Sequence, residues 1–221
     1  MKLHSYVIDH DLGFAPNPFY GVCTLAACKP KIREHASVDD YIIGTGCAKR
    51  KRSGYLVYFM RIQEVVSFDA YWNDPRFKVK RPNFCGSRMQ VYGDNIYHID
   101  AHNGHWIQEK SFHSYPDGKT NQGNFSNDTS STRVLISRDY AYWGGFGPAI
   151  PSCFRDCNGV DICCTRQGHK NRFPDDLIAA VVDWLRSFEA RGFQGRPLDW
   201  SRGRPIKRRD SEGRPFAFVH E

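Results

Sequence analysis

With 221 residues, of which 40% are hydrophobic, the chain is long enough to bury a sizeable core, and it has no run of about 18 apolar residues that would cross a membrane. Its formal net charge of +7 suits a polyanionic partner, although a solvated surface carries such an excess equally well. No Walker loop, dinucleotide-binding glycine motif or Gly-x-Ser-x-Gly elbow occurs, which argues against NTPases, dehydrogenases and hydrolases of those types.

The N-terminal residues lack the apolar core of a signal peptide, and the chain has eight cysteines. Without an export signal, this pattern favours free thiols in a reducing compartment. We therefore expect a cytoplasmic protein with no membrane partner, and nothing in the sequence implies a protein partner.

The first predicted elements are a strand, a rigid loop and a short helix. Residues 3–8 alternate in polarity as a strand does, and residues 28–33 favour a short helix. Between them, residues 13–21 contain two prolines and two glycines, which exclude regular structure. This loop displays Asn17, Phe19 and Tyr20, unless it is a surface connector whose aromatic rings point inward.

Residues 37–66 predict a hairpin. Polar turn residues lead into an apolar strand that ends at Gly46, the basic residues 49–52 form the tip, and residues 55–66 form one long strand. A short helical turn follows at residues 67–76. This arrangement resembles the barrel of PUA-like domains, a group that includes readers of modified bases. We therefore expect an α+β fold with a mixed, PUA-like barrel-type sheet and few helices, although a fold alone does not give a function.

The central stretch combines a polar loop with a buried strand. Residues 91–98 place a Gly-Asp-Asn turn among aromatic strand residues. Residues 111–128 are mostly Ser, Asn, Thr, Gly and Asp, which favour turns over helix, and residues 133–137 then read as a buried strand. A long polar loop beside a rigid strand often holds catalytic side chains. Asp128 is the last acid before that strand, although it and Asn127 would also serve as simple turn caps.

Five potential metal ligands lie between the central strand and the C-terminal helix: Cys153, Cys157, Cys163, Cys164 and His169. Their spacing is not the paired Cys-x-x-Cys of a zinc ribbon. We assign no metal and no cofactor, and the possibility that this group binds a metal stays open.

The C-terminal part predicts one amphipathic helix over residues 174–191. Pro174 suits the first helical position, acids follow it, and Gly192 ends the helix. Its apolar stripe of Ile178, Val181, Leu185 and Phe188 should pack outside the sheet. We predict a single domain over residues 1–195 and a basic extension over residues 196–221.

The basic residues gather in clusters with interleaved aromatic residues, as expected of a nucleic-acid-binding surface. We expect the following side chains to contact DNA phosphates: Lys49, Arg50, Lys51, Arg52, Arg204, Lys207, Arg208 and Arg209.

Three blocks of sequence together resemble the bacterial and phage family called nucleotide modification associated domain 2. The blocks are residues 13–21 with Cys28-Lys29-Pro30, residues 93–97, and Asp128-Thr129 with residues 133–137 and Tyr142. The likeness covers about residues 1–150, and it implies a role around modified bases in DNA. The chain is also similar to anti-phage DNA glycosylases that excise glucosylated hydroxymethylcytosine.

A glycosylase must flip the target nucleotide into a pocket and stabilise the positive charge that develops on the sugar. We assign that charge stabilisation to Asp128, with Asp94 as second choice. Asn17 or Asn127 would hold the attacking water, and His113 would donate a hydrogen bond or proton to the departing base. The candidates for binding the flipped nucleotide are Phe19, Tyr20, Asn95, Trp106, Asn124 and Trp143.

No lysine stands out as a Schiff-base nucleophile, so we expect a monofunctional enzyme that leaves abasic sites in double-stranded DNA. The alternative is a non-catalytic reader of modified bases, which needs no carboxylate at the sugar. A base-modifying transferase would want a donor-binding motif, which the sequence lacks.

Overall fold

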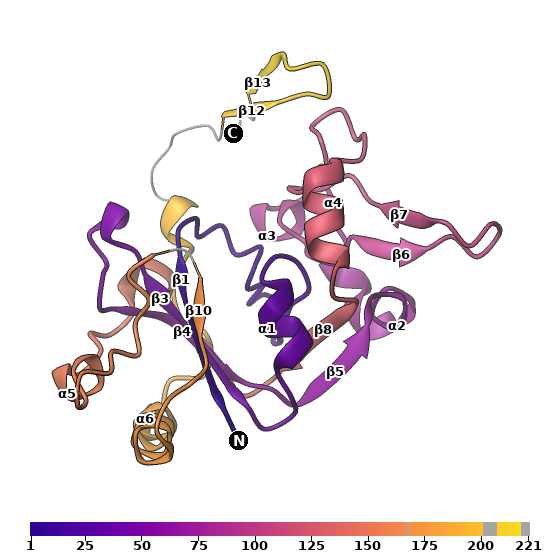
Figure 1. Ribbon diagram of the computed structural model, residues 1–221. Helices are drawn as coiled ribbons and strands as arrows, with labels where there is room; N and C mark the ends of the chain where they lie inside the picture. The colour runs from indigo at the N-terminus through magenta and orange to yellow at the C-terminus, as the bar shows by residue number, and fades with distance from the viewer. Residues whose placement is uncertain (167, 201–206, 218–221) are drawn as a thin grey trace.

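The computed structural model describes residues 1–166, 168–200 and 207–217. A mixed six-stranded sheet forms the centre of the fold (Figure 1), and β1 and β3 at its middle are parallel. In spatial order its strands are β10 (His169–Lys170), β1 (Leu3–Ile8), β3 (Tyr41–Gly46), β4 (Leu56–Arg61), β9 (Tyr140–Tyr142) and β11 (Gly192–Phe193).

A second sheet of three antiparallel strands lies beside the first. Its order is β2 (Cys23–Leu25), β8 (Arg133–Ser137) and β5 (Glu64–Ser67). Two separate hairpins complete the strands: β6 (Tyr97–Ile99) with β7 (Trp106–Gln108), and β12 (Lys207–Arg209) with β13 (Pro215–Ala217).

One antiparallel ladder runs through both sheets. Met60 pairs with Tyr140 in the larger sheet, and Glu64 pairs with Ile136 in the smaller sheet. Between these pairs one partner advances by four residues and the other goes back by four, so the register is kept while the ladder bends. The predicted long strand over residues 55–66 is therefore two strands, β4 and β5, that belong to different sheets.

The helices are short except for one. They are α1 (Pro30–His35), α2 (Phe68–Asn73), α3 (Arg88–Val91), α4 (Gln122–Thr129), α5 (Ser152–Arg155) and α6 (Asp175–Ser187). Single 3₁₀ segments occur at Ala48–Arg50, Pro75–Lys80, Gly144–Phe146 and Leu198–Trp200. None of the helices in the described ranges has the length and hydrophobicity of a membrane span.

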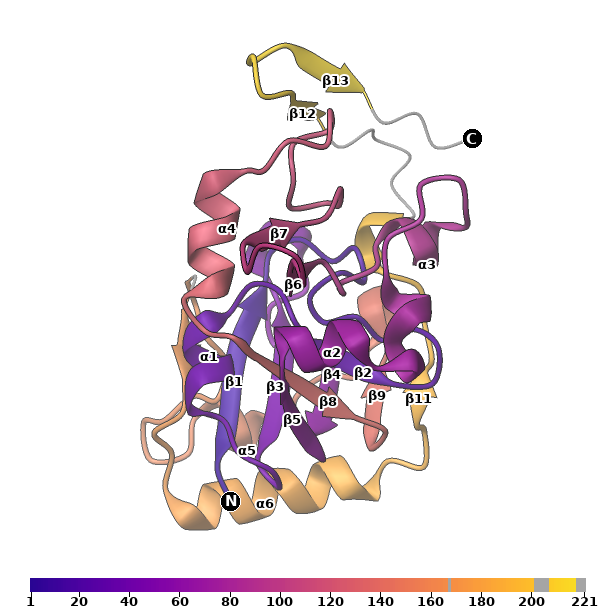
Figure 2. The ribbon, with the colours of Figure 1, turned by 90° about the vertical axis from the view of Figure 1, so that its right-hand side faces the viewer.

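Three apolar clusters hold these layers together. The α6 side chains Ile178, Val181 and Leu185 pack on one face of the six-stranded sheet, as predicted. The opposite face of that sheet packs on Ile32 of α1, which lies between the two sheets in Figure 1. The third cluster joins the small sheet to α2 and the β6–β7 region, and Figure 2 shows α4 alongside the same region.

The α+β class and the external helix are confirmed, but no closed barrel forms. In the described ranges, strand pairing ends at β10 and β11 in the large sheet and at β2 and β5 in the small one. The basic tip at residues 49–52 does join two antiparallel strands, β3 and β4. The helix α6 ends at Ser187, earlier than predicted, and Pro174 is its N-cap.

Candidate active site

The carboxylate of Asp128 is a meeting point of several chain segments. The predicted loop is helical here, because Asp128 lies in α4, where it has no exposed surface. The carboxylate accepts hydrogen bonds from the backbone N–H of Cys28 (2.9 Å), the hydroxyl of Tyr97 (2.8 Å), Nδ1 of His113 (2.6 Å) and the amide of Asn127 (3.2 Å). A buried charge is tolerated when it is paired and hydrogen-bonded in this way.

The guanidinium of Arg33 fixes the chain around this carboxylate. Arg33 is fully buried and donates to four carbonyl oxygens, those of Cys28 (2.9 Å), Asp128 (2.5 Å), Ser131 (2.5 Å) and Arg133 (2.8 Å). The five donors of an arginine form a rigid fork, so these bonds hold the segment before α1 against the end of α4.

His113 joins Asp128 to the thiol of Cys28. Its Nδ1 bonds to Asp128, and its Nε2 lies 3.4 Å from the sulfur of Cys28. The imidazole packs against the ring of Phe14, with centroids 4.7 Å apart. The backbone carbonyl oxygen of His113 accepts a hydrogen bond from the side-chain amide of Asn124 at 2.9 Å. The rigid loop at residues 13–21 and the helix α4 thus both position this histidine.

The charges in this group support one another. Burial opposes charge on His113, but the adjacent Cys28 sulfur and the hydrogen bond that the ring donates to Asp128 outweigh it and raise the pKa of His113 to about 10. Burial alone would raise the pKa of Asp128, yet the bond to His113 and the nearby Arg33 charge lower it. His113 is therefore an imidazolium at neutral pH, held by a carboxylate.

The three ligand atoms of Cys28, His113 and Asp128 lie within 4.8 Å of one another, which also suits a metal. Thiolate, imidazole and carboxylate are donors that zinc accepts. However, both Asp128 oxygens already accept hydrogen bonds, and one of these comes from the histidine itself. The arrangement therefore favours a hydrogen-bonded chain of thiol, imidazole and carboxylate, here called the Cys28 triad.

Asp94 and Asn17, two further predicted catalytic residues, lie elsewhere, in a second buried polar cluster around Lys80. The Lys80 ammonium donates to both oxygens of Asn17 (3.0 and 2.7 Å), to the carbonyl of Val22 (2.9 Å) and to the hydroxyl of Thr24 (3.1 Å). That threonine hydroxyl donates to Asp94 at 2.6 Å. All of these donors and acceptors serve to hold residues 17–24, so we interpret the cluster as structural.

Burial shifts both charged groups of this cluster. It lowers the pKa of Lys80 to about 8, although the nearby Asp94 opposes the shift. It likewise raises the pKa of Asp94 against the influence of Lys80. Asn95 is also fully buried, and its side-chain N–H groups donate to the carbonyls of Tyr71 (3.0 Å) and Phe77 (3.2 Å).

The four predicted stacking residues divide into two kinds. Phe19 is buried and stacks on Trp200, and Trp143 packs with Phe59 on the α6 side of the large sheet. Phe19 therefore offers no face to a base in this arrangement, and Trp143 is half-buried. Tyr20 and Trp106 are each 38% exposed and remain available.

The four basic residues at 49–52 fall into two groups, two that are bonded to other parts of the chain and two that are exposed. Arg50 pairs with Asp199 at 2.6 Å, and Arg52 donates to the carbonyl of Gly147 at 2.8 Å. Lys49 and Lys51 are exposed.

In the C-terminal hairpin, Arg208 bonds to the carbonyls of Ser111 and Ser114 and lies over the Phe112 ring, beside His113. Arg209 donates to the carbonyl of Gly213 at 2.6 Å. Arg204 and the side chain of Lys207 lie outside the described residues.

The C-terminal cysteine group does not converge on a metal-like site in the described parts of the chain. All eight cysteines are free thiols, as predicted. Burial raises the pKa of Cys163 to about 12, and the thiol of Cys164 faces the carbonyl of Ser5. His169 lies in the edge strand β10.

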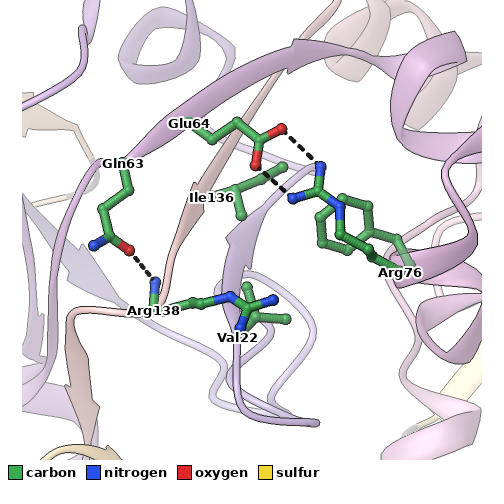
Figure 3. Close-up of a pocket in the computed structure, with 7 residues that line it drawn as sticks. Val22, Gln63, Glu64, Arg76, Ile136 and Arg138 are labelled. Atoms are coloured by element: carbon green, nitrogen blue, oxygen red, sulfur yellow. Dashed lines mark hydrogen bonds and ion pairs between the residues drawn. The ribbon is translucent and has the colours of Figure 1, made fainter.

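A pocket of about 170 Å³ opens on the small sheet, separate from the Cys28 triad. Figure 3 shows Arg76 held in a two-pronged ion pair by Glu64, with N–O distances of 3.0 and 2.8 Å. Arg138 beside Val22 donates its backbone N–H to the side chain of Gln63. Its exposed guanidinium makes this pocket suited to an anion, and no sequence motif marks it.

Sequence reasoning placed His113 and Asp128 in the site but missed Cys28, Tyr97 and Arg33. Cys28, Tyr97 and Asp128 each belong to one of the three resemblance blocks, and the structure brings those blocks together at one carboxylate. The irregular Cys28-Lys29-Pro30 block is the sequence signal that could have identified the thiol.

A family model described as nucleotide modification associated domain 2 matches residues 1–204. No curated protein and no solved structure matches the chain.

Proposed function

Because the chain belongs to the nucleotide modification associated domain 2 family, we propose that it is a monofunctional DNA glycosylase. Its substrate is double-stranded DNA with a hypermodified base, such as the glucosylated hydroxymethylcytosine of phages, and its product is an abasic site. In a bacterial cell this reaction would act in defence against phages. The observation that carries the proposal is the imidazolium of His113, held by Asp128 beside the partly exposed Cys28.

An imidazolium suits the departure of a base. A base inside a duplex is out of reach, so the nucleotide must first be flipped, at a cost of a few kcal/mol. When the bond from base to sugar breaks, the electron pair passes to the base, which then needs a proton. His113 is charged at neutral pH because its pKa is about 10, so it can donate that proton from Nε2.

Asp128 has a different role from the one the sequence suggested. Its oxygens are fully buried and hydrogen-bonded, so it acts through His113 rather than at the sugar. The carboxylate selects the orientation of the ring and stabilises its charge, as the acid of a catalytic triad does. Asp128 is thus a positioning residue.

Part of the surface needed for a flipped nucleotide is available. Tyr20 and Trp106 each expose part of an aromatic ring, and stacking on such a ring is worth about 1–3 kcal/mol per base. Lys49 and Lys51 are exposed cations suited to phosphates. Asn124 donates to the backbone carbonyl of His113 and so helps to position that residue, while its contact with substrate stays a prediction.

The test is base release under single-turnover conditions. The protein is incubated with unmodified, hydroxymethylated and glucosylated phage DNA, and free bases and abasic sites are measured by mass spectrometry. We expect release from the modified DNA, and we expect His113→Gln to slow it about 10²–10⁴-fold because a general acid contributes that much.

His98→Gln is the matched control. His98 also pairs with a carboxylate, Glu109, at 2.9 Å, but it neighbours Tyr97 on strand β6 and so points to the opposite face. Its loss should leave the rate near wild type. Tight binding of modified DNA without release of any base would contradict the proposal and favour the alternative, a non-catalytic reader.

A further inference from the structure

The side chain of Cys28 lies in line with a histidine and a carboxylate, as the nucleophile of a triad does. The sulfur is 3.4 Å from Nε2 of His113, whose other nitrogen is 2.6 Å from Asp128. Nucleophile, base and orienting acid within hydrogen-bond reach are the mark of covalent catalysis. An imidazolium beside a sulfur stabilises the thiolate, which is the reactive form.

The backbone at Cys28 is strained in a way that presents this sulfur. Cys28 and Lys29 have φ of 58° and 44°, so two consecutive residues other than glycine adopt the left-handed conformation. Strain of this kind persists where the surrounding structure enforces it, and it clusters at functional sites. Here Asp128 accepts the Cys28 backbone N–H, and Arg33 holds its carbonyl. Both backbone groups of Cys28 are thus fixed, and the residue as a whole stays half-buried.

The other seven cysteines have no imidazole partner in the described parts of the chain, and among them Cys47 is buried and Cys157 is half-buried. Burial raises the pKa of the thiols of Cys23, Cys163 and Cys164. Cys85 and Cys153 are exposed, and neither thiol has an imidazole partner among the described residues. Cys85 and Cys153 therefore serve as internal references for the reaction rate of an ordinary accessible thiol.

We propose that Cys28 is the catalytic nucleophile and that the reaction passes through a covalent bond between its sulfur and the sugar. This inference rests on the proposed function. In the first step the thiolate attacks C1′, the bond from C1′ to the base breaks, and its electron pair goes to the base nitrogen, which takes the proton of His113. In the second step water attacks C1′, the carbon–sulfur bond breaks with its electron pair returning to sulfur, and the water proton passes to His113. The abasic sugar is released and the enzyme is regenerated.

The first experiment uses no DNA. The wild-type protein is treated with iodoacetamide at pH 6.5, where an unassisted thiol is almost entirely protonated, and alkylation of each cysteine is followed by peptide mass spectrometry. We expect Cys28 to react at least about 10-fold faster than Cys85 and Cys153 in the same sample, and His113→Gln to bring it to their rate. Equal rates in the wild type would overturn the proposal, and this comparison does not depend on the folding of any variant.

The second experiment uses modified DNA. Denaturing quench of a single turnover should yield a Cys28 peptide that carries the sugar-linked strand, and Cys28→Ser should slow base release at least about 10²-fold while DNA affinity is kept. Wild-type release by Cys28→Ser would overturn the nucleophile and leave the glycosylase standing. A fast-reacting Cys28 without any base release would overturn the glycosylase and leave the activated thiol standing.

Discussion

The Asp128 carboxylate accepts four hydrogen bonds without any exposed surface, which changes what its replacement should do. In Asp128→Asn the new side-chain NH₂ group faces groups that themselves donate hydrogen bonds, and the imidazolium of His113 loses its negative partner. We expect base release to slow about 10²–10⁴-fold and the free energy of unfolding to fall by about 1–3 kcal/mol. If Asp128 lay in an exposed polar loop, as the sequence predicted, the same substitution would change the free energy of unfolding little. Single-turnover release and urea unfolding on one preparation measure both effects.

Asp94→Asn is the matched control for that experiment, because Asp94 is another fully buried, hydrogen-bonded aspartate. It should lose similar stability and keep a rate near wild type. A rate loss confined to Asp94→Asn would instead make Asp94 the catalytic acid, the second choice from sequence.

The charge of His113 gives stability a dependence on pH. Its pKa is about 10 in the folded chain and about 6.5 when unfolded, so it stabilises the fold fully below pH 6.5, and that contribution is lost as the pH rises toward 10. Asp128, with its lowered pKa, stays charged throughout this range. The difference in unfolding free energy between wild type and His113→Gln should therefore shrink from pH 6 to pH 10. A difference that stays constant over this range would contradict the assigned imidazolium.

At the scale of elements, Lys80 connects the 3₁₀ segment Pro75–Lys80 to residues 17–24. Lys80→Met removes four hydrogen bonds and the cation next to Asp94. Removing one partner of a buried charged group costs about 3–5 kcal/mol, and we expect a loss of that size in urea unfolding. Lys78→Met, at an exposed position of the same segment, should change stability by less than about 0.5 kcal/mol. Equal effects of both substitutions would show that the buried bonds contribute nothing.

The elements that sequence missed are those held by distant contacts. The segment Gln122–Thr129 is rich in Asn, Ser and Gly, which favour turns, yet it is helical because Asn121 caps it and Arg33 and Cys28 bind its end. The strand at residues 133–137 and the helix after Pro174 were predictable, because their apolar periodicity matches the faces they bury. The bend at residues 61–63 has no comparable pattern in the sequence. It separates β4 from β5 and thus divides the strands between two sheets.

At the scale of the whole molecule, the positive charge is only partly available to DNA. Lys49 and Lys51 are exposed, whereas Arg50 is committed to Asp199. We expect Lys49→Ala and Lys51→Ala to lower DNA affinity and each to reduce the slope of log affinity against log salt by about 0.9. Arg50→Ala should lower thermal stability with a smaller effect on that slope. A slope unchanged by all three would place the DNA on another surface.

The candidate site was predictable only in part, because its residues are far apart in the sequence and meet only in the folded chain. The sequence identified His113 and Asp128 through their polar surroundings, but Cys28 meets them only through the folded chain. Spacing along the chain gave no sign that residues 28, 113 and 128 meet. What the sequence did contain was the set of irregular blocks, each of which supplies one group around the carboxylate.

The bent ladder has a consequence for the order of folding. Ser67 pairs with Arg133, so the chain between them is a closed loop, and it carries both His113 and Asp128, whereas Cys28 lies outside it. The entropy cost of closing such a loop must be met before its contacts stabilise the fold. Proteins with non-local pairing of this kind fold in about milliseconds to seconds. During refolding from urea, the rapid alkylation of Cys28 should therefore appear only with the slowest structural phase, as measured by pulsed iodoacetamide beside tryptophan fluorescence. Full reactivity in the earliest phase would mean that the thiol is activated without the triad. A newly made chain would thus gain the fast reaction of Cys28, and its action on DNA, only when its topology is complete.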